Sequence, residues 1–183
     1  MKIKKLLFAS ALLFSAYNAS AQTQVIAHRG FWKTEGSAQN SIAALLKADS
    51  IGCYGSEFDV WLAADDQLVV NHDPTFKGKR MENSPSTALT AIKLDNGESL
   101  PTLAKYLKAA QPLHTRLILE LKAHSTPLRE TKAIEKIVAL VKDMGLEERN
   151  ISPSPCMPPK NLSAWLRKAL PSTILTVICH PRS

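Results

Sequence analysis

Four short apolar segments run directly into charged or imidazole side chains, and this repeated arrangement constrains the fold more than any other feature of the sequence. The segments are VIAHRG (25–30), SEFDVWL (56–62), LVVNHD (68–73) and LILELK (117–122). Short apolar runs of this kind are typical of strands in a parallel sheet. Polar side chains where such strands end are the usual site of chemistry in an α/β barrel. The sequence therefore predicts an active site at one edge of a parallel sheet.

Helix-like segments separate these strands. Residues 37–50, 101–110 and 127–144 each carry apolar side chains at helical spacing. Strands that alternate with helices imply parallel βαβ units. The predicted fold class is α/β, the first and incomplete half of a (β/α)8 TIM-type barrel. Residues 74–100 are polar and are predicted to be an irregular excursion over the top of the barrel.

Residues 1–21 have the pattern of a secretory signal peptide. Three lysines lie among the first five residues, Leu6–Ala16 is apolar but too short to span a bilayer, and Ala-Ser-Ala at 19–21 is a small-residue cleavage pattern. We expect the protein to be exported, periplasmic or secreted, with cleavage near Ala21 and no stable membrane anchor. An uncleaved membrane anchor is the alternative.

The net charge of +7 comes from the two ends of the chain. Residues 1–24 contribute three lysines and residues 151–183 contribute four basic side chains, and neither segment contains an acidic residue. Residues 25–150 are therefore neutral. The basic balance gives no reason to expect a nucleic-acid partner.

Three acidic residues on predicted strands form a candidate metal site. Glu57 and Asp59 are two residues apart, so both point to one face of their strand. Glu120 interrupts an apolar run, and a buried carboxylate requires a cationic partner. Side-by-side carboxylates repel unless a cation or a proton lies between them, and their oxygens suit a hard divalent cation. Two alternatives stay open: a solvated face of an edge strand, and a structural ion pair of Glu120 with Lys122.

Two histidines follow strands beside this acidic set. Either His28 or His72 alone could be a structural histidine, but together they fit a general acid and a general base. Arg29 offers a planar guanidinium that suits a phosphate. Asp73 either orients His72 or caps the loop that follows.

The motifs HRG, EFDVWL, LVVNHDPTF, LPTL and LILELK resemble the glycerophosphodiester phosphodiesterase family in order and spacing, over roughly residues 25–145. The resemblance implies a TIM-type barrel that cleaves glycerophosphodiesters to glycerol 3-phosphate and an alcohol. It also implies a small-molecule phosphodiester substrate and a divalent cation, Mg²⁺ or Ca²⁺. The site residues that it implies are the metal ligands Glu57, Asp59 and Glu120, the acid/base pair His28 and His72, and the phosphate contacts Arg29 and Lys122.

The chain departs from the family pattern after HRG. The family usually has Glu-Asn there, and this chain has Gln39-Asn40. The missing carboxylate is expected to alter the metal affinity or the orientation of neighbouring ligands, though not the fold.

The sequence changes character after Asn150. The segment ISPSPCMPPK has four prolines within seven residues, which cannot supply the backbone donors of a central strand. Residues 24–150 are therefore predicted to be a partial domain of this family, and residues 151–183 an irregular tail. Back-translation allows codons in which a one-base slip restores a strand–helix–strand pattern, so we expect a frameshift near Asn150.

Half a barrel would leave strand edges unpaired and the substrate pocket open. We therefore expect weak or absent activity from this chain, and aggregation unless it dimerises. Three functions stay open: metal-dependent hydrolysis of glycerophosphodiesters, a non-catalytic truncated product that at most binds a cation, and a phospholipase D-like or inositol-lipid phosphodiesterase. The sequence determines neither the alcohol that is released nor the oligomeric state.

Overall fold

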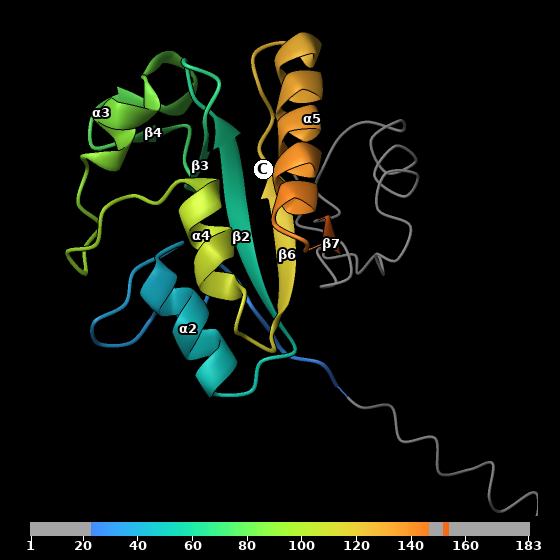
Figure 1. The fold of residues 1–183 in the computed structure, drawn as a ribbon. Helices are drawn as coiled ribbons and strands as arrows, with labels where there is room; N and C mark the ends of the chain where they lie inside the picture. Colours follow the sequence, from blue (N-terminus) through green and yellow to red (C-terminus); the bar gives the residue numbers. More distant parts are fainter. Residues whose placement is uncertain (1–22, 147–151, 154–183) are drawn as a thin grey trace, which may run out of the picture.

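The computed structural model describes residues 23–146 and 152–153 (Figure 1), so the predicted signal peptide and most of the predicted tail lie outside the described residues. A five-stranded sheet organises this part of the chain, with the order β1-β2-β6-β7 and with β3 paired to β2. The strands are β1 (Ile26–Ala27), β2 (Gly55–Leu62), β3 (Leu68–Val70), β6 (Arg116–Leu121) and β7 (Ser152–Pro153).

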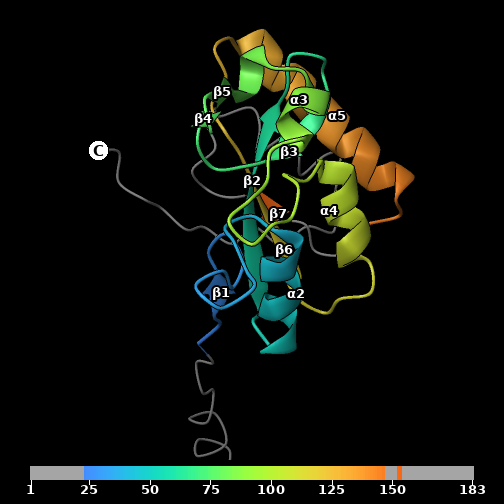
Figure 2. The ribbon, with the colours of Figure 1, turned by 90° about the vertical axis from the view of Figure 1, so that its left-hand side faces the viewer.

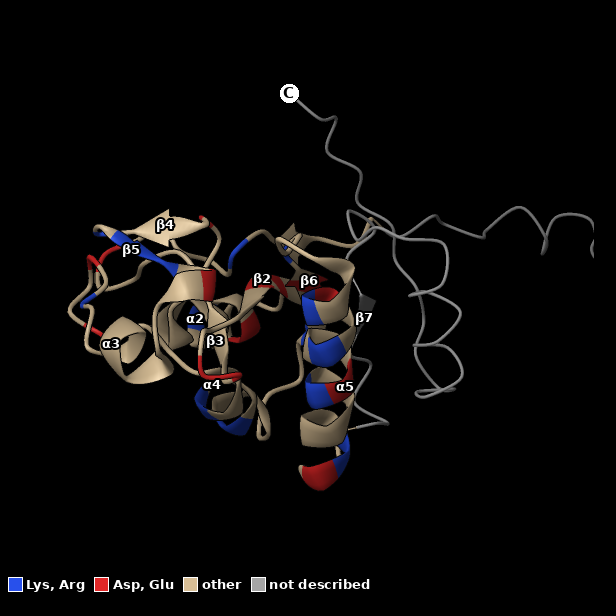
Figure 3. Ribbon diagram, turned by 90° about the horizontal axis from the view of Figure 1, so that it is seen from above, with Lys and Arg blue, Asp and Glu red and all other residues tan. Residues whose placement is uncertain are grey.

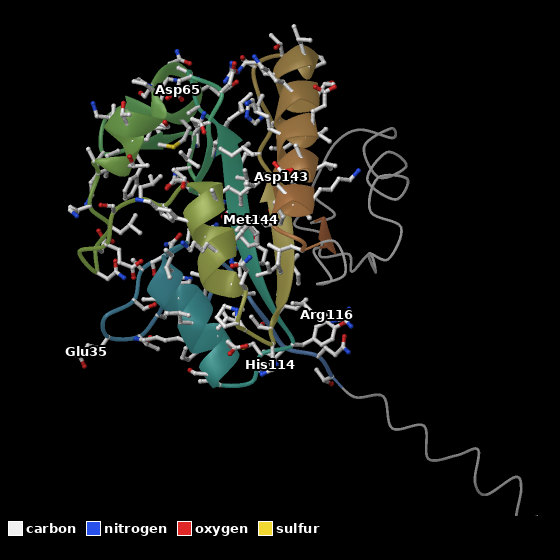
Figure 4. All side chains as sticks on the ribbon, viewed as in Figure 1. Glu35, Asp65, His114, Arg116, Asp143 and Met144 are labelled. Carbon is white, nitrogen blue, oxygen red and sulfur yellow. The ribbon has the colours of Figure 1, made fainter. Side chains whose placement is uncertain are left out.

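The strands β1, β2 and β6 are parallel, which confirms the predicted α/β class. Both β2 and β6 run upward in Figure 1, and Figure 4 places Arg116 near their lower ends and Asp65 beyond the upper end of β2. The prediction of parallel strands throughout is wrong for β3, which is antiparallel to β2. The five residues between β2 and β3 can close a hairpin, whereas a parallel crossover needs a dozen or more.

Three helices cover one face of the sheet (Figures 1 and 2). They are α2 (Ile42–Ser50), α4 (Leu103–Ala110) and α5 (Pro127–Asp143). The first starts later than predicted because the Ser41 side chain accepts a hydrogen bond from the Ala44 backbone N–H and caps the helix there.

Because side chains alternate between the two faces of a strand, the apolar core lies on one face of the sheet and the candidate site on the other. Phe58, Val60 and Leu62 of β2 pack in one apolar cluster with residues of all three helices. The Phe58 ring lies 4.6 Å from the Tyr106 ring of α4. Because successive side chains on a strand point to opposite faces, Glu57 and Asp59 lie on the face away from the helices.

The predicted irregular excursion is instead a small folded unit. It contains the hairpin β4 (Thr75–Phe76) and β5 (Lys79–Arg80), the 3₁₀ helix η2 (Met81–Asn83) and the helix α3 (Ser86–Thr90). The prediction failed because a few buried apolar side chains are scattered among polar ones. Together with Trp61 and Val69 they form a second core, which includes Met81, Leu89, Ile92, Leu94 and Leu100.

The prediction of no strand after Asn150 is wrong at two residues. Ser152 and Pro153 form β7, which pairs in parallel with Ile118 and Leu119 of β6. Among the described residues β7 has one neighbouring strand, so the missing N–H of Pro153 need not interrupt a ladder. This edge of β6 is therefore partly paired. No helix within the described ranges is both long enough and apolar enough to cross a membrane.

Replacing the central aromatic side chain of the core should destabilise the chain strongly. Phe58 is fully buried, so we expect Phe58→Ala to lower the free energy of unfolding by about 3–5 kcal/mol, through lost burial and the cavity left behind. Denaturant unfolding measures the change. Leu128→Ala is the control, because Leu128 is 78% exposed on α5 and should change the value by less than about 0.5 kcal/mol. Similar values for both variants would contradict the described core.

Candidate metal and phosphodiester site

The three predicted carboxylates come together on the face opposite the helices. Asp59 and Glu120 are direct partners across the parallel pair β2–β6, and Glu57 lies two residues before Asp59 on the same face. One oxygen from each of the three carboxylates lies within 4.8 Å of the others. Glu57 and Asp59 are buried, and β2 lies between β1 and β6, so the alternative of a solvated edge strand is wrong. Figure 3 shows red acidic positions on β2 and both blue and red positions along α5.

Two cationic side chains partly balance these carboxylates. Lys122 Nζ lies 2.8 Å from Glu120 Oε1 and 3.3 Å from Asp59 Oδ1. Burial alone would lower the pKa of Lys122, but the Asp59 and Glu120 carboxylates outweigh it and hold that pKa above its ordinary value. Arg29 Nε lies 4.0 Å from Asp59 Oδ2. The predicted ion pair of Glu120 with Lys122 is thus present, and it bridges to Asp59.

Glu57 is the carboxylate that a cation would satisfy best. Its Oε2 accepts a hydrogen bond of 2.8 Å from the Arg29 backbone N–H, whereas its buried Oε1 has no hydrogen-bond partner in the described part of the chain. Burial, followed by repulsion from Asp59, raises the pKa of Glu57 to about 8. An unpaired buried oxygen beside two further carboxylates fits a hard cation such as Mg²⁺ or Ca²⁺. The residues present therefore fit the predicted cofactor.

His28 lies beside this cluster, and His72 lies on the loop after β3. His28 Nε2 is 3.9 Å from Glu57 Oε2. His72 Nδ1 is 2.8 Å from Asp73 Oδ1. Asp73 therefore orients His72, which is one of its two predicted roles. The Trp61 indole N–H also donates to the His72 backbone carbonyl at 3.3 Å, which ties the His72 loop to β2.

A cavity of about 230 Å³ is lined by Asn40, which in turn contacts Asp59 of the cluster. Its lining includes Gln39, Asn40, Asn71, His72, Phe76 and Trp32. These residues come from the loop before α2, the loop after β3 and the small folded unit. A substrate that occupies this cavity would contact His72 directly and lie next to Asn40, which contacts the carboxylate cluster.

Two neighbouring residues had no predicted contact at the site. Asn40 Nδ2 donates to Asp59 Oδ2 at 2.8 Å, and Asn40 Oδ1 accepts from the Asp59 backbone N–H at 3.2 Å. Arg29 NH1 donates to Gln39 Oε1 at 2.6 Å. Asn40 has φ +58°, a left-handed conformation that asparagine tolerates better than most residues. An asparagine in a loop between a strand and a helix was the available signal, but asparagines in loops are too common to single it out.

A curated relative and solved structures are both similar to this chain. No family model matches the chain. A curated glycerophosphodiester phosphodiesterase from Caldanaerobacter subterraneus subsp. tengcongensis is 32% identical over 144 residues, which cover 71% of this chain and 57% of that protein.

Solved structures agree with this relative. The crystal structure of a glycerophosphodiester phosphodiesterase from Parabacteroides distasonis is 45% identical with a TM-score of 0.76, over 84% of this chain and 64% of that one. An Oleispira antarctica phosphodiesterase in complex with the product sn-glycerol-3-phosphate is 25% identical with a TM-score of 0.69, over 85% of this chain and 65% of that one. This chain therefore spans less than two thirds of the length of these relatives.

The raised pKa of Glu57 should make stability depend on pH. Between its ordinary value of 4.5 and about 8, the folded chain keeps the Glu57 proton that the unfolded chain releases. The unfolded state then binds fewer protons, so stability should fall as the pH rises through this window. Thermal unfolding in EDTA measures the fall, and Glu57→Gln should make it shallower.

A divalent cation requires the ionised carboxylate. We therefore expect Mg²⁺ or Ca²⁺ to raise the Tm of the wild-type chain more at pH 8 than at pH 6. The same cation should have little effect on Glu57→Gln. Equal pH slopes for the two proteins in EDTA, together with equal stabilisation by the cation, would contradict the described environment of Glu57.

Proposed function

This chain is a relative of the glycerophosphodiester phosphodiesterases, which are phosphoric diester hydrolases, and on that premise we propose that its site hydrolyses glycerophosphodiesters to glycerol 3-phosphate and an alcohol. The observation that carries the proposal is the carboxylate cluster, which the cationic side chains of Lys122 and Arg29 contact and which His28 adjoins. The neighbour with bound sn-glycerol-3-phosphate supports the same product.

Glu57, Asp59 and Glu120 would hold the divalent cation, Mg²⁺ or Ca²⁺. The bound cation would supply Lewis-acid chemistry, by neutralising charge on the phosphoryl oxygens. Lys122 and Asn40 keep Asp59 in place through contacts of 3.3 Å and 2.8 Å. These contacts fix the ligand oxygens before a substrate arrives.

The remaining side chains would bind the phosphate and move protons. The Arg29 guanidinium and the Lys122 ammonium bind phosphoryl oxygens. His28, beside Glu57, accepts a proton from the attacking water. His72, which lines the cavity and is oriented by Asp73, donates a proton to the oxygen of the departing alcohol. One proton is taken up and one is released, so the pair is reset by exchange with solvent.

Release of glycerol 3-phosphate from glycerophosphocholine tests this function. We expect metal-dependent release that stops in EDTA and falls about 100-fold or more in Glu120→Gln, because one cation ligand is lost. Glu135→Gln, an exposed change on α5, is the matched control and should keep the wild-type rate. No release by the wild-type chain in the presence of either cation would contradict the proposal.

The rate of the 183-residue chain is expected to be low. Its described strands form an open sheet, and small misplacements of reacting groups cost about 100-fold in rate. We therefore expect turnover about 100-fold or more below that of the Parabacteroides distasonis relative under the same conditions. Equal rates would show that these 183 residues are sufficient for full activity, and would exclude the non-catalytic alternative.

We also propose that the protein is exported. The support is the sequence of residues 1–21 alone, with its basic start, apolar centre and small-residue end. Mass spectrometry of protein recovered outside the cytoplasm should find a mature N-terminus at or near Gln22. An intact Met1 on exported protein would contradict cleavage.

A further inference from the structure

The Arg29 side chain is held in place by a neutral partner. Its backbone has φ +58° and donates to Glu57 Oε2, so the residue is fixed at the carboxylate cluster. Its guanidinium donates one hydrogen bond among the described residues, from NH1 to Gln39 Oε1 at 2.6 Å. The buried Nε of Arg29 has no hydrogen-bond partner there. The guanidinium therefore keeps donors for a further acceptor.

Gln39 supplies an amide oxygen where a carboxylate would fit equally well. An amide orients the guanidinium through a hydrogen bond but leaves its positive charge in place, whereas a carboxylate would also neutralise it. Gln39 also lines the same cavity as Asn40. The identity of this side chain thus affects the charge beside the cavity, whose lining also includes Lys33, Asp73 and Asp95.

We propose that Gln39 sets the anion affinity of the site, by orienting the Arg29 guanidinium without neutralising it. The inference rests on the proposed function, because it assigns the anion as the phosphoryl group of the phosphodiester. Gln39 is a positioning residue in this proposal, and Arg29 makes the contact with the phosphate.

A charge count gives the proposal its quantitative form. When all three carboxylates are ionised, they and the two cationic side chains give a net charge of −1, which a divalent cation converts to +1. A phosphodiester carries one negative charge and matches this value. Glutamate at position 39 would reduce the net charge to zero. The loss of affinity should then grow with the charge of the ligand, because the electrostatic free energy is proportional to that charge.

Two small anions of different charge test this dependence. Dimethyl phosphate is a monoanion, and methyl phosphate is a dianion at pH 8, well above its second pKa near 6. Their dissociation constants would be measured by ³¹P NMR titration of the full chain with Mg²⁺ present. We expect Gln39→Glu to weaken the binding of dimethyl phosphate about tenfold and that of methyl phosphate about 100-fold, because methyl phosphate carries twice the charge.

Two further variants separate charge from structure. Gln67→Glu adds the same charge at an exposed position in the turn between β2 and β3, and should leave both dissociation constants close to wild type. Gln39→Leu removes the amide contact without adding charge, and should weaken the binding of each anion less than Gln39→Glu does. A merely structural role of Gln39 would instead weaken the binding of the two anions equally in Gln39→Glu.

Three results would overturn the proposal: no binding of either anion by the wild-type chain, unchanged binding in Gln39→Glu, or equal weakening of the two anions in that variant. Failure of the proposed function is a separate outcome. If charge-dependent weakening is found but no glycerophosphodiester is cleaved, the role of Gln39 stands and the hydrolase activity does not.

Discussion

The arrangement of the site depends on the parallel pairing of β2 with β6. This pairing sets Asp59 opposite Glu120 and keeps Glu57 on the same face, which concentrates negative charge in a buried place. Such a cluster is unfavourable unless cations or protons offset it. The Lys122 ammonium lies between two of the carboxylates, and burial together with repulsion from Asp59 raises the pKa of Glu57 to about 8, which favours its protonated form. A divalent cation can replace that proton.

The other face of the same strand provides the stability that this cluster requires. Phe58 and its neighbours pack against three helices, so the energetic cost on one face is met by apolar burial on the other. Loops then complete the site. The segment before α2 brings Gln39 and Asn40 to Arg29 and Asp59, and the loop after β3 brings His72 to the cavity. Strands thus hold the three candidate metal ligands, while loops hold Gln39, Asn40 and His72.

All seven predicted site residues lie within the described part of the chain, although the chain spans only 57–65% of the length of its relatives. Ligand binding by these side chains and closure of the scaffold around them can therefore be tested separately. Binding of a cation or an anion depends on a few side chains held by β2, β6 and their loops. Turnover requires those side chains to hold substrate within a fraction of an ångström, which depends more strongly on the surrounding scaffold.

Local patterns in the sequence predicted which carboxylates come together at the candidate site and on which strands they lie. Alternation along 56–62 placed Glu57 and Asp59 on one face, and a carboxylate within an apolar run marked Glu120, because these signals depend only on strand geometry and on the cost of burying charge. The direction of β3 and the contacts of the loop residues could be found only in the tertiary structure. The antiparallel β3 and the small core around Met81 depend on which distant segments pair and pack. The contacts of Asn40 and Gln39 arise because their loop, in which Asn40 has a left-handed backbone conformation, folds back onto β2. A sequence pattern does not encode that long-range contact.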